Sequence, residues 1–257
     1  MKDFSEERKI KIIEKLKNES KVFVNSLVKE FGVSDTTIRR DLDDLSYNKL
    51  IVRTHGGAII NKNYNLDLEL EIDDRKSIHL EEKKKIAETA VNFVNNGDSI
   101  LLGGGTTTLE LTRLLNKFKN LKVITNSLEA SFELSKINNI ELIITGGKFS
   151  VKSSILTGTS VINYLDNINV DKLFFSTSGV DIKKGLTNPL SIDAEILSKM
   201  IEVSTEKYLL ADSSKFGQVF FKKIKPIISV NKIITDDKID SKTVDNIKDL
   251  GIDILIC

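Results

Sequence analysis

The chain of 257 residues carries 38 Lys and Arg against 37 Asp and Glu, which leaves a formal net charge of +1 at pH 7. Its length suits one large domain or two modest ones, and 40% hydrophobic with 29% charged residues is typical of a globular protein. Because the charges balance, the sequence excludes a protein that binds nucleic acid through overall basic charge, so any such contact requires a local patch.

Several kinds of site are excluded by the residue types present. The only cysteine, Cys257, is the last residue, which excludes an internal disulfide and a cysteine-based metal cluster. His79 has no Cys or His near it in the sequence, and we expect no metal, no cofactor and no Ser-His-Asp arrangement. An apolar run of about 18 residues and a signal-peptide pattern are both missing, so we expect a cytoplasmic protein with no membrane partner.

The first part of the chain predicts helices separated by short turns. Apolar residues recur through residues 6–17 and predict a short helix, and the β-prone segment Val22-Phe23-Val24 follows it. A second helix then ends at Gly32, a residue suited to the left-handed conformation of a helix stop. Only Gly32 and Val33 separate this helix from Ser34, a good N-cap for the next one.

The helix that follows Ser34 is amphipathic. Ile38, Leu42 and Leu45 recur at i, i+4 and i+7 and predict one apolar stripe against a small core. The opposite face carries short hydroxyl donors and two guanidiniums, those of Thr36, Thr37, Arg39 and Arg40. Such a face suits a DNA major groove, and the two helices with their tight turn form the layout of a helix-turn-helix. Taken alone, the same pattern also fits an ordinary amphipathic helix with a solvated basic face.

A β-hairpin is predicted directly after this helix. The β-prone residues 50–53 and 56–60 flank a turn with two glycines, which suit positive φ angles. A hairpin in this place is the wing of a winged helix, where Arg53 and His55 would lie near the phosphate backbone, while Arg39 with Thr36 and Thr37 would read base edges. We therefore assign DNA binding to Ser34, Thr36, Thr37, Arg39, Arg40, Arg53, His55, Gly56 and Gly57.

The remainder of the chain predicts a linker and a larger domain. Residues 61–80 have no apolar period and are rich in Asn, Asp and Glu, as expected of a linker between domains. Apolar strand patterns then alternate with helical ones, which predicts an α/β domain with a mostly parallel sheet covered on both faces. The predicted organisation is a winged helix-turn-helix at residues 1–60, a linker at residues 61–80 and an α/β domain at residues 81–257.

The segment Gly103-Gly104-Gly105-Thr106-Thr107-Thr108 follows the first predicted strand of that sheet and opens a helix. Glycines let the backbone approach an anion, while hydroxyls and the amides of a helix N-terminus donate to it. Similar residues follow other strands, at Thr125-Asn126-Ser127, Thr145-Gly146-Gly147-Lys148 and residues 212–217. Ligands bind at the carboxyl ends of strands in open α/β sheets, and Lys215 supplies a cation. Each turn alone could be merely tight, and none is a Walker or dinucleotide motif, but together they predict an anion site.

These motifs resemble the DeoR family of bacterial transcriptional regulators over almost the whole chain. The N-terminal resemblance lies in Val33-Ser34, Thr37-Ile38-Arg39-Arg40-Asp41-Leu42 and Arg53-x-His55-Gly56-Gly57-Ala58. The C-terminal half is similar to the family's sensor domain, which is related in fold to ribose-5-phosphate isomerase, through residues 105–108, 125–127, 146–147, 179–181 and 212–217. The resemblance implies a repressor of sugar catabolism genes that is relieved by a phosphorylated sugar in the C-terminal domain.

The resemblance also implies which residues contact the effector. These are Gly104, Gly105, Thr106, Thr107, Thr108, Asn126, Ser127, Gly146, Gly147, Asp181 and Lys215. The chain departs from the family pattern twice: Gly103 stands where the family usually has Asp, and Leu197-Ser198 replaces a common Lys-Arg pair. The first change would remove an acceptor for sugar hydroxyls, and the second a cationic contact to the ligand or to a neighbouring subunit.

Two functions are compatible with this pattern, an effector-gated DNA-binding regulator and a phosphosugar isomerase with an accessory N-terminal domain. An aldose–ketose isomerase needs a carboxylate base, and the acidic run of the related isomerases is reduced here to Asp181. We therefore expect a regulator without catalytic residues, acting as repressor or activator according to promoter position. Its expected partners are a double-stranded DNA operator, a phosphorylated sugar and further copies in a dimer or tetramer, because one winged helix contacts little DNA.

Overall fold

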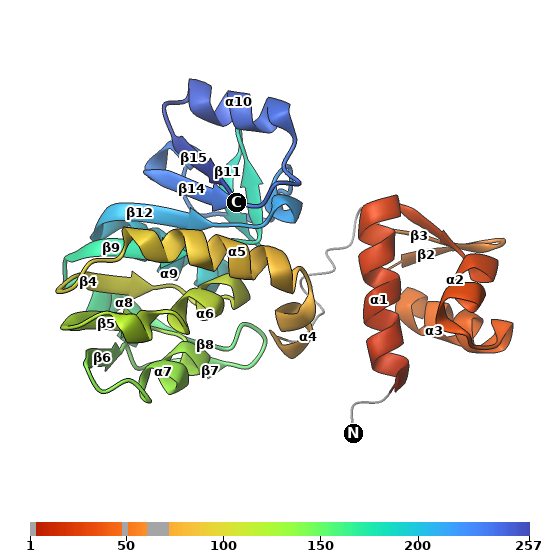
Figure 1. Cartoon of the computed structure of the whole chain (residues 1–257), viewed down its shortest axis with the longest axis horizontal. Helices are drawn as coiled ribbons and strands as arrows, with labels where there is room; N and C mark the ends of the chain where they lie inside the picture. Colours follow the sequence, from red (N-terminus) through yellow and green to blue (C-terminus); the bar gives the residue numbers. More distant parts are fainter. Residues whose placement is uncertain (1–3, 48–50, 61–71) are drawn as a thin grey trace. The chain divides into compact units, whose positions relative to one another are not determined.

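The computed structural model describes residues 4–47, 51–60 and 72–257, and the chain divides into two compact units, Met1–Ile78 and His79–Cys257 (Figure 1). The division falls inside the predicted linker, residues 61–80. Residues 61–71 of that segment lie outside the described residues, and a helix of 6 residues, α4 (Ile72–Ser77), follows them. This helix was not predicted, because so short a helix cannot display an apolar period.

The first unit has the architecture of a winged helix-turn-helix, as predicted. Its helices and strands are α1 (Phe4–Glu19), β1 (Lys21–Phe23), α2 (Val24–Phe31), α3 (Asp35–Tyr47), β2 (Ile51–Thr54) and β3 (Gly57–Ile60). Gly32 ends α2 in the left-handed conformation, with φ of 63°. The expected hairpin of β2 and β3 gains a third antiparallel strand, because β1 pairs with β3.

The apolar stripe predicted on α3 is buried. Ile38 and Leu42 have no exposed surface and Leu45 is 4% exposed, and all three belong to one cluster with Ile12 and Leu16 of α1. Burial of a side chain of this size stabilises a fold by about 1.5–3 kcal/mol. The stripe therefore fixes α3 with one face inward and leaves the face that carries Thr36, Arg39 and Arg40 exposed.

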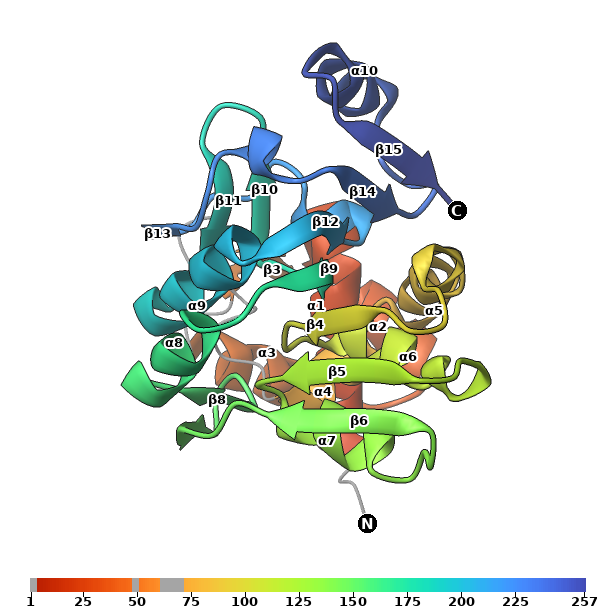
Figure 2. The same ribbon diagram turned by 90° about the vertical axis from the view of Figure 1, so that its left-hand side faces the viewer.

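The second unit is built on a seven-stranded parallel sheet, which confirms the predicted α/β architecture (Figures 1 and 2). The strand order is β15 (Asp253–Ile256), β14 (Lys232–Thr235), β12 (Ser204–Leu210), β9 (Val170–Phe175), β4 (Ser99–Leu102), β5 (Leu121–Thr125) and β6 (Ile140–Ile144). Each neighbouring pair is parallel. The carboxyl ends of these strands therefore lie at one edge of the sheet, where the loops that follow them meet.

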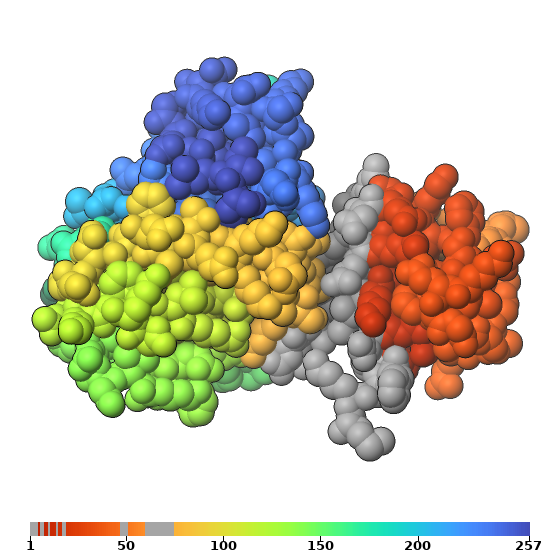
Figure 3. Space-filling model, viewed as in Figure 1, coloured from red at the N-terminus to blue at the C-terminus, as the bar shows by residue number. Residues whose placement is uncertain are grey.

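Helices cover both faces of this sheet. One face carries α5 (Leu80–Ala90), α6 (Thr106–Thr112) and α7 (Leu128–Leu134), and the other carries α8 (Thr159–Leu165), α9 (Ser191–Glu202) and α10 (Ser241–Asp249). Successive strand residues alternate between the faces, so Leu101 packs with the second group of helices and Leu102 with the first. In the space-filling view the side chains of α5, α6 and α7 close over their face (Figure 3).

Smaller elements lie between these strands and helices along the chain. They are the antiparallel pair β7 (Lys148–Ser150) and β8 (Ile155–Thr157), the antiparallel strands β10 (Gly179–Asp181), β11 (Gly185–Asn188) and β13 (Lys222–Lys223), and the 3-10 turns η2 (Val91–Phe93), η3 (Leu115–Lys117), η4 (Ser213–Lys215) and η5 (Ile227–Ser229). Within the described residues, no helix combines the length and apolar character needed to cross a bilayer.

Candidate functional site

The N-terminal end of α3 carries a connected group of hydroxyls. The Ser34 hydroxyl accepts from the Thr37 amide at 3.2 Å, which caps the helix, and it lies 2.8 Å from the hydroxyls of both Thr36 and Thr37. Ser34 and Thr36 are exposed and Thr37 is partly exposed. Three polar side chains assigned to DNA binding are thus held together at the end of the helix that can enter a major groove.

Arg39 is held by an acidic neighbour that sequence reasoning did not single out. Its Nε donates to Asp35 Oδ1 at 2.5 Å and its Nη2 to Asp35 Oδ2 at 3.3 Å. The hydrogen bond from Asp35 and the charge of its carboxylate raise the pKa of Arg39, so the guanidinium stays charged. Arg40 follows on the exposed face of the same helix.

Arg53 connects the wing to α3. Its Nε lies 2.9 Å from Asp43 Oδ1, and its Nη1 donates to the Gly57 carbonyl at 3.0 Å. The side chain is only 25% exposed. Its main visible contacts therefore hold the wing against the helix, which leaves a smaller part of the guanidinium available to a phosphate than the sequence analysis expected.

The wing turn differs from the predicted one in the reason for its glycines. Neither Gly56 nor Gly57 has a positive φ angle. Gly57 is buried, and a Cβ there would lie 1.9 Å from the Val22 carbonyl oxygen, so glycine is required for β1 to pack beside β3. His55 and Gly56 are exposed at the turn, where they can approach a partner.

In the second unit, the strand order decides which predicted effector residues meet. The loop after β4 (Gly103 to Gly105) has β5 on one side and β9, then β12, on the other. With neighbouring strands about 4.8 Å apart, β12, which the turn with Lys215 follows, runs about 10 Å from β4. Ser176, at the end of β9, lies between them, and its Cβ is 3.4 Å from the position of a Cβ on Gly105. Sequence reasoning did not include Ser176 in the site.

The glycine loop is shaped by its own threonines and by β8. Thr108 Oγ1 donates to the carbonyls of Gly103 at 2.8 Å and Gly105 at 2.9 Å, so this hydroxyl serves the loop itself. Thr107 and Thr108 are buried, whereas Thr106 is partly exposed. A Cβ on Gly104 would lie 2.1 Å from Ile155 Cγ2, so this glycine is needed for the packing of β8 over the loop.

Asn126 presents an unpartnered acceptor beside this loop. The side chain is 1% exposed, and its Nδ2 donates to the Leu156 carbonyl at 3.1 Å. That bond fixes the orientation of the amide, because a carbonyl cannot pair with Oδ1. Oδ1 is buried without a hydrogen-bond partner, 3.9 Å from the position of a Cβ on Gly104. The neighbouring Ser127 hydroxyl instead accepts from the Ala130 amide at 3.2 Å and caps α7.

Two other predicted effector residues, Gly147 and Asp181, have contacts that serve the fold. Gly147 allows close approach to β8, because a Cβ there would lie 2.6 Å from the Thr157 carbonyl oxygen, and Gly146 is exposed beside it. The Asp181 carboxylate accepts from the amides of Lys183 at 2.9 Å and Lys184 at 2.7 Å in the turn between β10 and β11. The carboxylate of Asp181 thus stabilises that turn.

Lys215 lies in a turn that two buried carboxylates organise. Asp212 accepts from the Ser214 amide at 3.1 Å, and Asp236 accepts from the Ser213 amide at 2.6 Å. Burial alone would raise the pKa of the Asp212 carboxyl, but the charge of Lys215, the hydrogen bond from Ser214 and the charges of His79 and Lys83 lower it. Asp212 therefore stays ionised and helps to keep the Lys215 ammonium at the carboxyl edge of the sheet.

The two departures from the family pattern are neighbours in the fold. A Cβ on Gly103 would lie 3.1 Å from Phe175 Cβ and 3.4 Å from Leu197 Cδ2. Phe175 is fully buried and Leu197 is 7% exposed. The wall below the glycine loop is therefore apolar at the two positions where the family pattern places charged residues.

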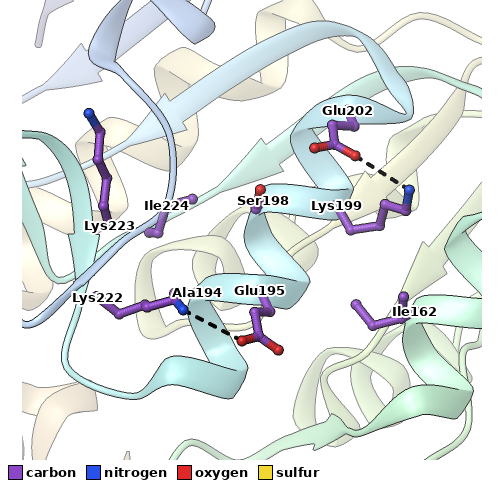
Figure 4. Close-up of a pocket in the computed structure, with 9 residues that line it drawn as sticks. All are labelled: Ile162, Ala194, Glu195, Ser198, Lys199, Glu202, Lys222, Lys223 and Ile224. Carbon is purple, nitrogen blue, oxygen red and sulfur yellow. Dashed lines mark hydrogen bonds and ion pairs between the residues drawn. The ribbon is translucent and has the colours of Figure 1, made fainter.

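A separate groove of about 350 Å³ lies between α8, α9 and β13. It is lined by Ile162, Ala194, Glu195, Ser198, Lys199, Glu202, Lys222, Lys223 and Ile224 (Figure 4). Lys222 lies 3.7 Å from Glu195 and Lys199 lies 3.3 Å from Glu202, and Figure 4 shows both pairs directed at each other. Since Lys199 and Lys222 are paired with glutamates, this groove is a weaker candidate for an anion than the strand-end loops.

Both halves of the chain match models of known protein families. The DeoR-like helix-turn-helix domain matches residues 8–64, and the DeoR C terminal sensor domain matches residues 78–237. The uncharacterized HTH-type transcriptional regulator YulB of Bacillus subtilis is 35% identical over 243 residues, which are 95% of this chain and 93% of that protein. The lactose phosphotransferase system repressor of Staphylococcus epidermidis is 33% identical over 219 residues, 84% of this chain and 86% of its own.

Solved structures match less of the chain. Ribose 5-phosphate isomerase A from Methanocaldococcus jannaschii is similar with a TM-score of 0.40 and 22% sequence identity. The similarity covers 54% of this chain and 55% of the isomerase, so the chain spans about half the length of that solved structure.

The two family matches contain the surfaces described above. The exposed face of α3 and the wing lie within the first match, and the strand-end loops from Gly103 to Lys215 lie within the second. The likeness to YulB extends over almost the whole chain. The chain therefore belongs to the DeoR family of transcriptional regulators, which bind DNA through their helix-turn-helix domain.

Proposed function

We propose that the protein is a repressor of sugar catabolism genes whose binding to its operator is controlled by a phosphorylated sugar at the strand-end loops of the second unit. Family membership and a relative named as a lactose phosphotransferase system repressor support this proposal. Because one winged helix contacts little DNA, the active species is a dimer or tetramer that binds repeated half-sites.

On the operator, the exposed face of α3 enters the major groove. Thr36, Thr37 and Arg39 contact base edges, because they occupy the N-terminal part of the helix, and Arg40 contacts a base or a phosphate. His55 and Gly56 at the exposed wing turn contact the phosphate backbone. Ser34 and Arg53 act mainly through the contacts that hold this surface, namely the helix cap and the link between α3 and the wing.

The main support for the proposed effector site is the buried, unpartnered oxygen of Asn126. Leaving a buried acceptor unpaired costs about 1–3 kcal/mol, and native proteins seldom keep one without a reason. Its place beside the glycine loop favours a ligand that donates a hydrogen bond there, and a sugar hydroxyl is such a donor. The apolar wall at Gly103 and Leu197 favours a ligand without a charged group on that side.

A phosphate on the same ligand needs amide donors and a cation. The glycine loop offers backbone amides together with the Thr106 hydroxyl, and Lys215 supplies the positive charge from the turn after β12. The strands that these two loops follow, β4 and β12, are about 10 Å apart, a span that a phosphorylated sugar can bridge together with the Lys215 side chain. Together, an acceptor, amide donors and a lysine at one edge of the sheet suit a polyhydroxylated phosphate ester.

We propose a regulator rather than an isomerase because the nearby carboxylates already have partners in the fold. Asp181 accepts from two turn amides, Asp212 from Ser214, and Asp236 from the amides of Ser213 and Lys238. A general base must be able to take a proton from the substrate. Turnover of ribose 5-phosphate by the purified protein above about 1 per second would reverse this preference.

The ligand and the operator oppose each other in this proposal. The Asp212 carboxylate interacts electrostatically with Lys215, and also with His79 and Lys83 at the beginning of α5, the first helix of the second unit. A phosphate bound at Lys215 changes that balance of charge at the point where the chain enters from the linker. The placement of the DNA-binding units then shifts, and operator affinity falls in proportion to the ligand's preference for the released state.

A thermal-shift screen tests the effector site. The panel contains fructose 1-phosphate, fructose 6-phosphate, tagatose 6-phosphate and glycerol 3-phosphate, each beside its unphosphorylated parent. A specific ligand at about 100 times its Kd stabilises the folded protein by about 2.7 kcal/mol, which appears as a higher Tm. Lys215→Ala and Asn126→Ala should lose that shift relative to their own unliganded Tm, whereas Lys222→Ala, in the groove of Figure 4, should keep it. An unchanged shift in Lys215→Ala would contradict the site.

A further inference from the structure

Asp35 lies on α3 beside the arginine that the proposed function assigns to base reading. The two carboxylate oxygens of Asp35 accept from Nε and Nη2 of Arg39, at 2.5 Å and 3.3 Å. The side chains are 46% and 47% exposed, so the pair lies on the open face of the helix. We propose that Asp35 is a specificity-determining residue, which positions the Arg39 guanidinium for one base pair of the operator.

The geometry of the pair explains how this positioning works. Asp35 grips the guanidinium from the side, through Nε and one hydrogen of Nη2. The hydrogens of Nη1 and the second hydrogen of Nη2 remain directed away from the carboxylate. Guanine offers two acceptors in the major groove, O6 and N7, which suit two such donors. Because a free arginine side chain samples many rotamers, holding it before contact lowers the entropy lost on binding the right base.

The charge of Asp35 adds a second effect. A carboxylate on the face that meets DNA is repelled by phosphates, so it weakens binding to every sequence alike. When Asp35 holds Arg39 in place, the arginine binds the matching base pair more tightly and the other base pairs more weakly. Asp35 therefore raises the ratio of operator binding to random binding while lowering the affinity for random DNA, which is how repulsion contributes to specificity.

A simpler role for the pair leads to different expectations. Exposed ion pairs at i and i+4 stabilise a helix by about 0.3–0.5 kcal/mol, and an acidic residue in the first turn also favours the helix dipole. If Asp35 only stabilised α3, its removal would weaken binding to operator and to random DNA together. The two roles are distinguished by whether the two affinities change in the same direction.

The experiment first selects preferred sequences from a random duplex pool with the full-length protein, and then measures affinity for the selected duplex, its single-base variants and a random duplex. The variants are Asp35→Ala, Asp35→Glu, Arg39→Ala and the double variant. Asp44→Ala is the matched control, because it removes one negative charge from the same helix, where Asp44 lies 3.0 Å from Lys9 of α1.

Arg39→Ala should lose the preference for one guanine, roughly 5- to 150-fold. Asp35→Ala should lose about threefold or more of that preference while its affinity for random DNA stays equal or rises, as expected when one bidentate contact is loosened. Asp35→Glu should retain the preference, and adding Asp35→Ala to Arg39→Ala should change discrimination no further. Asp44→Ala should leave the base preference intact.

The inference rests on the proposed function, in which Arg39 reads a base, and the variants separate the two. If Arg39→Ala loses the guanine preference but Asp35→Ala keeps it, or if Asp35→Ala weakens both duplexes equally, the role of Asp35 is overturned while the assignment of Arg39 stands. If Arg39→Ala itself keeps the base preference, the assignment of Arg39 fails and the role of Asp35 fails with it.

Discussion

Arg8 of α1 and Asp41 of α3 form an almost buried ion pair, in which Nε lies 2.6 Å and Nη2 lies 3.1 Å from the two carboxylate oxygens. The side chain of Asp41 is 3% exposed and that of Arg8 is 14% exposed. The pair joins the first helix of the DNA-binding domain to the helix that carries the DNA-contacting face. Asp41 is buried whereas Arg39 and Arg40 are exposed, so the contribution of this pair to DNA binding is to hold α3 in place.

Removing one partner of this pair should unfold the first unit more readily. Asp41→Ala removes the carboxylate that accepts two hydrogen bonds from a largely buried guanidinium, and we expect a loss of about 3–5 kcal/mol in the free energy of unfolding of that unit. Chemical denaturation measures it, with Asp44→Ala as the control, because Asp44 is 49% exposed and its surface pair contributes less than about 1 kcal/mol. Equal losses for both variants would show that the buried pair contributes no more to stability than the exposed pair.

Adjacent glycines in the wing should respond differently to the same change. A Cβ on Gly57 would lie 1.9 Å from the Val22 carbonyl oxygen, whereas nothing lies within 4 Å of a Cβ on Gly56. Gly57→Ala must therefore displace β1 from β3, at a cost of about 1–3 kcal/mol or more, while Gly56→Ala should be nearly neutral. Thermal unfolding followed by affinity for random DNA tests this, and a wing that tolerates both changes would rule out the packing described.

Charged residues introduced at positions 103 and 197, the two departures from the family pattern, should have strongly coupled effects on stability. Gly103→Asp places a carboxylate against Phe175 and Leu197, where it has no cation. A buried unpaired charge is costly, so we expect destabilisation of about 3–5 kcal/mol. Adding Leu197→Lys supplies the missing partner and should recover a large part of the loss. The double-mutant cycle measures this as a coupling above about 1 kcal/mol, and additive effects would show that positions 103 and 197 are independent.

The stability of the second unit should depend on pH through Asp212. The charge of Lys215 and its other partners hold the pKa of this carboxyl below its ordinary value of 3.8, despite burial. A lowered folded-state pKa contributes stability that is present above the unfolded pKa and lost as pH falls through the folded one. Lys215→Ala raises the pKa of Asp212, so its destabilisation relative to wild type should be greater at pH 7 than at pH 3. Unfolding at both pH values tests the sign, and a constant difference would contradict the coupling.

The helices of the first unit were largely predictable because their signals are local. The stripe of Ile38, Leu42 and Leu45 repeats with the helical period, and Gly32 marks a stop through its own conformational freedom. The parallel sheet was also predictable, since buried strands and helices alternate along the sequence. Gly56 and Gly57 show the limit of such reasoning, because the pattern identified the turn but gave the wrong reason for its glycines.

The candidate effector site was harder to derive, because its decisive contacts join distant segments. Asn126 has an unpartnered oxygen only because its amide nitrogen is fixed by Leu156, thirty residues away on β8. Gly104 is needed because Ile155 of the same strand packs against it, and no local sequence pattern predicts where that strand lies. Asp181 was predicted to bind the effector because a carboxylate that serves a turn and one that binds a ligand look alike in sequence. In the structure it accepts from two amides of its own turn.

The most direct test of the central claim measures operator DNA and the phosphorylated sugar on the same preparation of the full-length protein. Fluorescence anisotropy gives operator affinity with and without the ligand found by thermal shift, and calorimetry gives ligand affinity with and without operator. Linkage requires the two factors to be equal, and we predict a reduction of about 5- to 150-fold in each. Lys215→Ala should bind operator as tightly as the wild-type protein does, and its operator affinity should not change when the ligand is added. If the ligand binds but operator affinity is the same in its presence, control by a phosphorylated sugar is contradicted.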